Sequence, residues 1–221
     1  MLAYCIVEQQ NQINIPANGV EGAPVQCMDV RNLRCFVSEF AAHIPSEPVP
    51  EMVKAFHQVL QRIFAQTAII PFRFPTIVEN EGVLRQFVEG RSAEYSNALR
   101  RLRNKVQMDV RIILNPSASL PSANSVNRSS SQSGTKYLED RRGRYQQAQS
   151  ILDEFRRVSN SLAEEWIQRD TPSGIRGFAL MERSAMPVFL EKIGRVVTPS
   201  DISARVTGPW PPSEFVEIVG E

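Results

Sequence analysis

The stretch VQMDVRIIL at residues 106–114 carries the clearest structural signal in the chain. Apolar and polar side chains alternate over most of its length, and the apolar ones are Val106, Met108, Val110, Ile112 and Leu114. Alternation with a period of two is typical of a β-strand that buries one face. The stretch therefore predicts a strand whose other face, with Gln107, Asp109 and Arg111, points to solvent.

The residues before this strand predict three strands, a helix and a further strand. The strands are expected at residues 2–7, 25–30, 32–38 and 68–74, with the second and third forming a hairpin, and the helix at 49–66. Strand alternation would place Phe72 and Phe74 together in the core and Arg73 on the opposite face, where it would pair with a group of the second domain. Asn80 is expected to cap one further helix that reaches Leu102.

The residues after 114 predict a β–long α–β–short α–β order. Residues 115–134 contain eight serines, which favours a mobile loop that the fold does not need. A long helix is expected after Gly134, with an apolar stripe from Leu138 to Trp166. A strand at 174–182, a helix at 187–193 and a strand at 201–207 follow.

These orders predict an α+β fold with two ferredoxin-like domains built on antiparallel sheets. The N-terminal domain is expected at residues 1–78. The C-terminal domain, at 79–221, would have a long helix packed on a small antiparallel sheet and would include the loop 115–134 and the tail.

The charge of the chain is balanced only on average. Twenty-five basic and 24 acidic residues give +1, but residues 91–157 hold 13 basic and six acidic side chains, a local charge of +7. Two interpretations fit this excess of basic residues. The cations could lie near helix ends and on solvated faces, or they could form a binding site for an acidic partner such as a nucleic acid.

Residue patterns that carry common chemistries are missing from the sequence. His43 and His57 have no metal-ligand spacing, and neither phosphate-binding glycine motifs nor a nucleophile elbow occurs. Cys5, Cys27 and Cys35 fall in predicted strands and are expected to be core thiols. We therefore expect no enzyme, no cofactor and no metal, and the lack of a long apolar run or a signal peptide favours a soluble cytoplasmic protein.

The segment GPWPP at residues 208–212 is stiff, because proline restricts φ and removes backbone donors. The last strand should therefore end at Gly208. Trp210 would then either fill a gap between the domains or stay partly exposed as an anchor for a partner. We expect the buried arrangement.

Four stretches resemble the gas vesicle protein F/L family (GvpF/GvpL). They are VTGPWPPSEFV at 206–216, FHQVLQRIF at 56–64, IIPFRFPTIVENEGVLRQF at 69–87 and GTKYLEDRR at 134–142. The residues that carry the resemblance, and that could form an interface, are His57, Phe72, Arg73, Phe74, Tyr137, Leu138, Gly208, Pro209, Trp210, Pro211, Pro212 and Phe215.

The resemblance implies an N-terminal modified ferredoxin-like domain and a C-terminal α+β domain. It also implies a non-enzymatic accessory protein, in the cytoplasm and associated with gas vesicles, that binds the hydrophobic shell subunit and other accessory proteins during assembly. Nucleic-acid or nucleotide binding through the basic segment is the alternative, and it predicts an affinity that falls steeply with salt. An enzyme that uses His57 is the third hypothesis.

Overall fold

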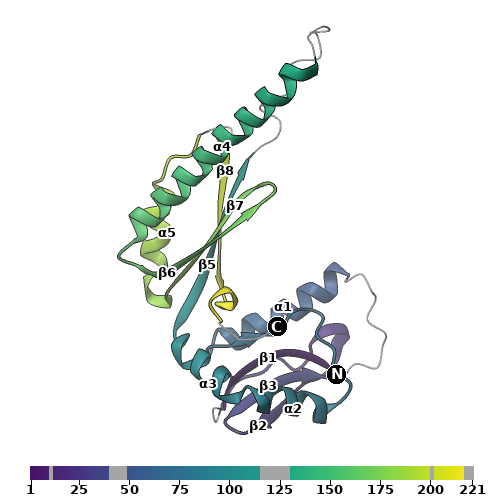
Figure 1. The fold of residues 1–221 in the computed structure, drawn as a ribbon. Coiled ribbons are helices and arrows are strands. Elements are labelled where there is room, and N and C mark those ends of the chain that lie inside the picture. Colours follow the sequence, from purple (N-terminus) through teal and green to yellow (C-terminus); the bar gives the residue numbers. More distant parts are fainter. Residues whose placement is uncertain (10–11, 40–48, 115–129, 200–201, 217–221) are drawn as a thin grey trace. The chain divides into compact units, whose positions relative to one another are not determined.

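The computed structural model describes residues 1–9, 12–39, 49–114, 130–199 and 202–216. The chain divides into two units, one made of Met1–Lys105 with Trp210–Glu221 and the other of Val106–Pro209. Each unit holds a four-stranded antiparallel sheet, and five α-helices stand among the described residues (Figure 1). The predicted α+β class is therefore confirmed.

The sheet of the first unit has the strand order β2-β3-β1-β4. Its strands are β1 (Leu2–Glu8), β2 (Val25–Val30), β3 (Leu33–Ser38) and β4 (Ile70–Pro71). In the described residues the connection from β1 to β2 has no α-helix, only a 3-10 turn at Val20–Gly22. The continuous apolar run at the start of the chain becomes the central strand β1, which is buried on both faces.

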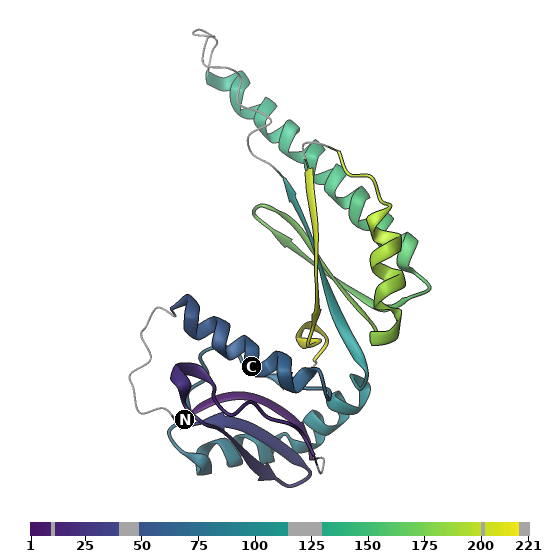
Figure 2. The same cartoon turned by 180° about the vertical axis from the view of Figure 1, so that it is seen from behind.

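Helices cover both faces of the first sheet (Figure 2). On one face lies α1 (Pro50–Phe64), where the Phe56 ring stacks on Tyr4 with centroids 5.2 Å apart. On the other lie α2 (Glu81–Gly90) and α3 (Ser92–Arg101). Their buried residues Leu84, Val88, Tyr95 and Leu99 share one core cluster with β1 and β3.

Two predictions for this unit are wrong in detail. The expected single helix is two, because Arg91 breaks it at φ −125°, and the break allows both helices to bury a face on the sheet. The Asn80 cap is confirmed, since its Oδ1 accepts a hydrogen bond of 3.1 Å from the Val83 N–H. The expected strand 68–74 is only two residues long and ends at Pro71.

Because the chain leaves the sheet after Pro71, Phe72 and Phe74 do not share a face. Phe72 packs against the core cluster of α2 and α3, whereas the Phe74 ring lies 5.0 Å from Phe56 of α1. Both side chains are half-buried rather than fully enclosed.

The second unit has the strand order β6-β7-β5-β8. Its elements are β5 (Lys105–Leu114), α4 (Ser130–Ser159), β6 (Ala163–Thr171), β7 (Gly174–Glu182), α5 (Met186–Gly194) and β8 (Ile202–Trp210). Both helices lie on one face of this sheet (Figures 1 and 2). The approach of α4 to β7 is close, since a Cβ at Gly177 would lie 2.6 Å from Leu152 Cδ1.

The structure corrects the predicted long helix at both ends. It begins at Ser130, so residues 130–134 are helical and not part of a loop, while residues 115–129 lie outside the described part of the chain. It ends at Ser159, and Trp166 belongs to β6, which pairs with β7 in a hairpin. Apolar residues with helical spacing can also be accommodated in a strand. Here the pairing with β7 makes the residues around Trp166 a strand.

The last strand does not end at Gly208, because β8 continues to Trp210. Proline is tolerated there since β8 is an edge strand, which needs backbone donors on one side only. Gly208 has φ +139°, and a Cβ at this position would lie 2.9 Å from the Gln107 carbonyl oxygen of β5. Only glycine fits this close approach.

The domain boundary expected between residues 78 and 79 differs from the division in the structure, which falls after Lys105 and after Pro209. Residues 81–101 belong with the first sheet because their apolar faces complete its core. The segment from Trp210 onward returns to the same unit, so the first unit is built from both ends of the chain.

Candidate binding surfaces

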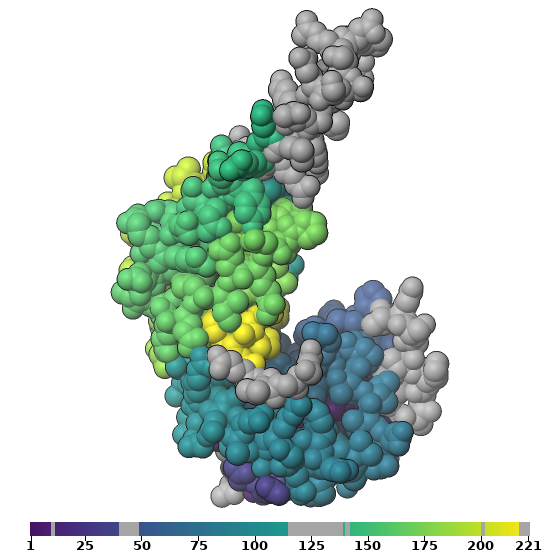
Figure 3. Space-filling view, in the orientation of Figure 1, coloured from purple at the N-terminus to yellow at the C-terminus, as the bar shows by residue number. Residues whose placement is uncertain are grey.

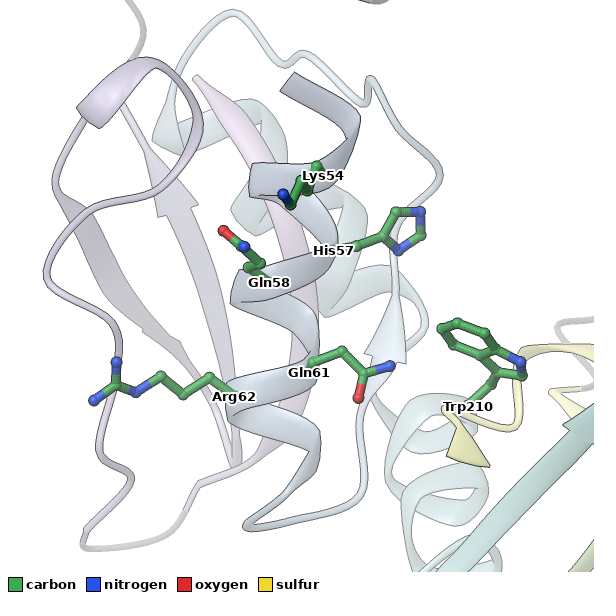
Figure 4. Close-up of a pocket in the computed structure, with 6 residues that line it drawn as sticks. All are labelled: Lys54, His57, Gln58, Gln61, Arg62 and Trp210. Atoms are coloured by element: carbon green, nitrogen blue, oxygen red, sulfur yellow. The ribbon is translucent and has the colours of Figure 1, made fainter. Parts of the chain in front are cut away.

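The first unit has an open groove of about 660 Å³ along the solvent-facing side of α1 (Figure 4). Five polar side chains of α1 and one aromatic ring from the far end of the chain line it: Lys54, His57, Gln58, Gln61, Arg62 and Trp210. His57 and Trp210, which belong to separate sequence motifs, therefore lie on one surface.

The α1 wall of the groove is anchored in the core. The buried side of the helix carries Phe56, and the His57 ring stands edge-on to it with centroids 6.1 Å apart. Phe56 in turn packs on Tyr4 and Phe74. The groove wall is therefore as rigid as the core beneath it.

The Trp210 side of the groove is held by the residues that follow it. Pro211 and Pro212 are buried, and Phe215 is 2% exposed. The Arg101 guanidinium donates a hydrogen bond of 3.2 Å to the Phe215 carbonyl, which ties the tail to α3. Trp210 itself is half-buried, so the expectation that the indole is fully enclosed is wrong.

A second surface of the first unit lies on α2, which is at the surface of the molecule (Figure 3), and it carries exposed apolar side chains. Val83 and Phe87, one helical turn apart, are 44% and 45% exposed. The Phe72 ring lies 6.4 Å from that of Phe87, and the Arg91 guanidinium lies 5.6 Å above the Phe87 ring. Large apolar side chains that gather on a surface typically mark an interaction site.

The remaining motif residues are dispersed. Arg73 is exposed, and no described residue of the first unit pairs with its guanidinium, so its pairing with the second domain stays a prediction. Gly208 and Pro209 belong to β8, and Tyr137 and Leu138 lie on α4 with side chains outside the described set.

A buried carboxylate in the second unit was not anticipated. Asp109 is 3% exposed, although alternation predicted that it faces solvent, and Gln107 is buried as well. Asp109 Oδ2 accepts hydrogen bonds from Arg176 Nη2 at 2.6 Å and from Arg111 Nε at 3.2 Å. The Arg176 guanidinium also lies 4.8 Å from the Phe178 ring centroid. Two cations that satisfy one carboxylate form a structural ion pair, which residue spacing alone does not reveal.

The cysteines differ from one another. Cys5 and Cys35 are buried, and burial raises the pKa of the Cys35 thiol to about 12 and that of Cys5 well above its ordinary value. Cys27 is exposed, which contradicts the expectation that it is a core thiol. It lies on β2, the edge of its sheet, where one side of the strand meets solvent.

The basic segment 91–157 is divided between the two units, because residues 91–105 belong to the first and 106–157 to the second. Several of its arginines are paired, as in Arg103 with Glu8 and Arg157 with Glu154. Among the described residues no group of three or more His, Cys, Asp or Glu side chains could hold a metal ion, and no helix is long and apolar enough to span a membrane.

Comparison with known proteins agrees with the fold. The chain is similar over 99% of its length to the crystal structure of the gas vesicle protein GvpF from Anabaena sp. PCC7120, with a TM-score of 0.80, 17% identity and 96% of that chain covered. It is similar over 98% to GvpF from Microcystis aeruginosa, with a TM-score of 0.77, 15% identity and 98% of that chain covered. No curated protein sequence matches. The family model described as gas vesicle synthesis protein GvpL/GvpF matches residues 1–217, and the chain therefore belongs to this family.

Proposed function

We propose that this protein is a non-catalytic accessory factor of gas vesicle assembly that holds the hydrophobic shell subunit before it polymerises. Membership of the gas vesicle synthesis family supports the role in assembly. A shell subunit with an exposed apolar face aggregates in water unless another protein covers that face. The N-terminal unit would be the modified ferredoxin-like domain of the family, and the protein would act in the cytoplasm at the growing vesicle, together with other accessory proteins.

The observation that carries the proposal is the apolar surface on α2. Val83, Phe87 and Phe72 offer a contiguous apolar contact to a subunit of the same character. Burial of such side chains contributes about 25 cal/mol for each Å² of apolar surface removed from water.

The contact surface rests on a rigid base. Leu84 and Val88, the residues next to the two exposed ones, are fully buried in the core of the first unit. The Arg85 guanidinium donates a hydrogen bond of 3.0 Å to the Asp29 carbonyl of β2 and fixes α2 to the sheet. A preorganised surface loses little side-chain entropy when it binds.

The test is co-expression of this chain with the shell subunit in a bacterium that has no gas vesicles. The wild-type protein should keep the subunit in the soluble fraction and co-purify with it. Replacement of both Val83 and Phe87 by Ser should lower the retained fraction severalfold, because the apolar contact is lost.

Gln86→Ser on the same helix is the matched control, since Gln86 is exposed and polar. This variant should retain the subunit as the wild type does. Equal retention by the double serine variant, with an unchanged melting temperature, would remove the α2 surface from the proposal. Failure of the wild-type protein to retain the subunit would overturn the proposed function itself.

The alternative of nucleic-acid binding gains no support from the arrangement of charge, because the basic segment is divided between two units and partly neutralised by ion pairs. A gel shift with DNA or RNA at low salt is its direct test.

A further inference from the structure

We propose that the groove between α1 and Trp210 is a second binding site, which takes an acidic amphipathic segment of a partner protein. The site is separate from the apolar surface of α2, since α1 and α2 cover opposite faces of the first sheet. It would allow the protein to hold two partners of different chemistry.

Side chains that can donate hydrogen bonds form a row along one face of α1. Lys54, His57, Gln58, Gln61 and Arg62 follow the spacing i, i+3, i+4, i+7 and i+8, so all five lie along the same face of the helix. The row between Lys54 and Arg62 is about 12 Å long at 1.5 Å per residue. A partner segment of two helical turns, or of about four extended residues, spans this length.

The charge of the groove is entirely of one sign. Lys54 and Arg62 are exposed, and no carboxylate lines the groove. Elsewhere in the first unit arginines have carboxylate partners, as Arg34 has Asp29 at 2.6 Å and Arg103 has Glu8 at 2.5 Å. Within the described residues neither groove cation makes an ion pair. Carboxylates of a partner could therefore form ion pairs with these two cations.

Trp210 supplies the apolar part of the site. Its indole is half-buried and lies on the side of α1 to which His57 and Gln61 point (Figure 4), and the buried Pro211 and Pro212 follow it in the chain. Aromatic rings are common energetic centres of protein interfaces. The aliphatic stems of Lys54 and Arg62 extend the apolar contact, because such stems pack while their charged ends stay in water. A segment with an apolar side chain between two carboxylates matches this arrangement.

Two cations and one histidine favour a protein segment over a nucleic acid. Nucleic-acid sites typically neutralise about six to ten phosphates, and the groove offers too few charges for that. The glutamines Gln58 and Gln61 can both donate and accept hydrogen bonds, which suits a polar peptide.

Fluorescence of Trp210 in the full-length chain tests the proposal. The sequence contains two tryptophans, so Trp166→Phe makes Trp210 the only indole reporter. The probe is a synthetic helical peptide with two Glu seven residues apart and a Leu between them, compared with the same peptide carrying Gln in place of Glu. The Glu peptide should shift the Trp210 emission, and the shift should weaken as salt rises from about 0.05 M to about 1 M, where the Debye length falls to about 3 Å.

Charge reversal provides the matched variants. Lys54→Glu with Arg62→Glu should weaken Glu-peptide binding by about tenfold or more. Arg142→Glu, on an exposed arginine of α4 outside the groove, should leave it unchanged. Both variants should keep the wild-type melting temperature, because the altered residues are exposed.

Four results would overturn the proposal. These are equal binding of the Gln and Glu peptides, unchanged affinity after charge reversal, no shift at peptide concentrations up to about 1 mM, and competition by an oligonucleotide as effective as that by the acidic peptide. None of these affects retention of the shell subunit through α2, so the two proposals fail independently.

Discussion

The Arg101 guanidinium of α3 lies 3.2 Å from the carbonyl oxygen of Phe215, and this hydrogen bond joins residues 114 positions apart in the chain. The Phe215 ring is almost fully buried, and Val216 packs against the core cluster of the first unit. Phe215 and Val216 are therefore part of the core of the first unit.

Phe215→Ala should destabilise the protein by about 3–5 kcal/mol, the usual cost of removing a buried aromatic ring. Urea unfolding followed by circular dichroism measures the loss. Ser213→Ala, an exposed position in the same turn, should change the free energy of unfolding by less than about 0.5 kcal/mol. Equal stability of both variants would mean that the tail does not brace the core.

Trp210→Ala should affect binding more than stability. The indole is half-buried, so its loss should cost about 1–2 kcal/mol, less than the 3–5 kcal/mol of a fully buried ring. Binding of the acidic peptide, followed with a fluorescein label, should fall to background while the shell subunit is still retained. A large drop in melting temperature with intact peptide binding would contradict this prediction.

Asp109→Ala should be among the most damaging single substitutions in the second unit. It leaves Arg176 and Arg111 next to each other without the carboxylate that both contact, and breaking a buried ion pair costs about 3–5 kcal/mol. The control is Asp153→Ala, which removes an exposed ion pair with Arg156 and should cost less than about 1 kcal/mol. Similar midpoints in urea for the two variants would show that Asp109 is not structural.

Only Cys27 should react with iodoacetamide in the native protein near pH 8. The thiolate is the reactive form, and burial both shields Cys5 and Cys35 and raises their pKa, that of Cys35 to about 12. Mass spectrometry should find one adduct before and three after denaturation, and none on native Cys27→Ser. A second adduct on the native protein would show that a core thiol becomes accessible by local opening.

The sequence by itself determined the local elements whose residue pattern has one physical meaning. The alternation at 106–114 indicates a strand, and the three- and four-residue spacing at 50–64 indicates an amphipathic helix. The Asn80 side chain caps its helix by accepting a hydrogen bond from the N–H of Val83. The motif residues also identified the family, which the match over residues 1–217 bears out.

Only the tertiary structure decided which of these elements belong together and what each face meets. Trp166 has a spacing that suits a helix, but pairing with β7 places it in a strand. Asp109 is buried because Arg176, 67 residues away, neutralises it, and His57 and Trp210 line one groove because the tail returns to the first unit. Local patterns report the conformation that a segment prefers, whereas burial and pairing depend on contacts between residues that are distant in the chain.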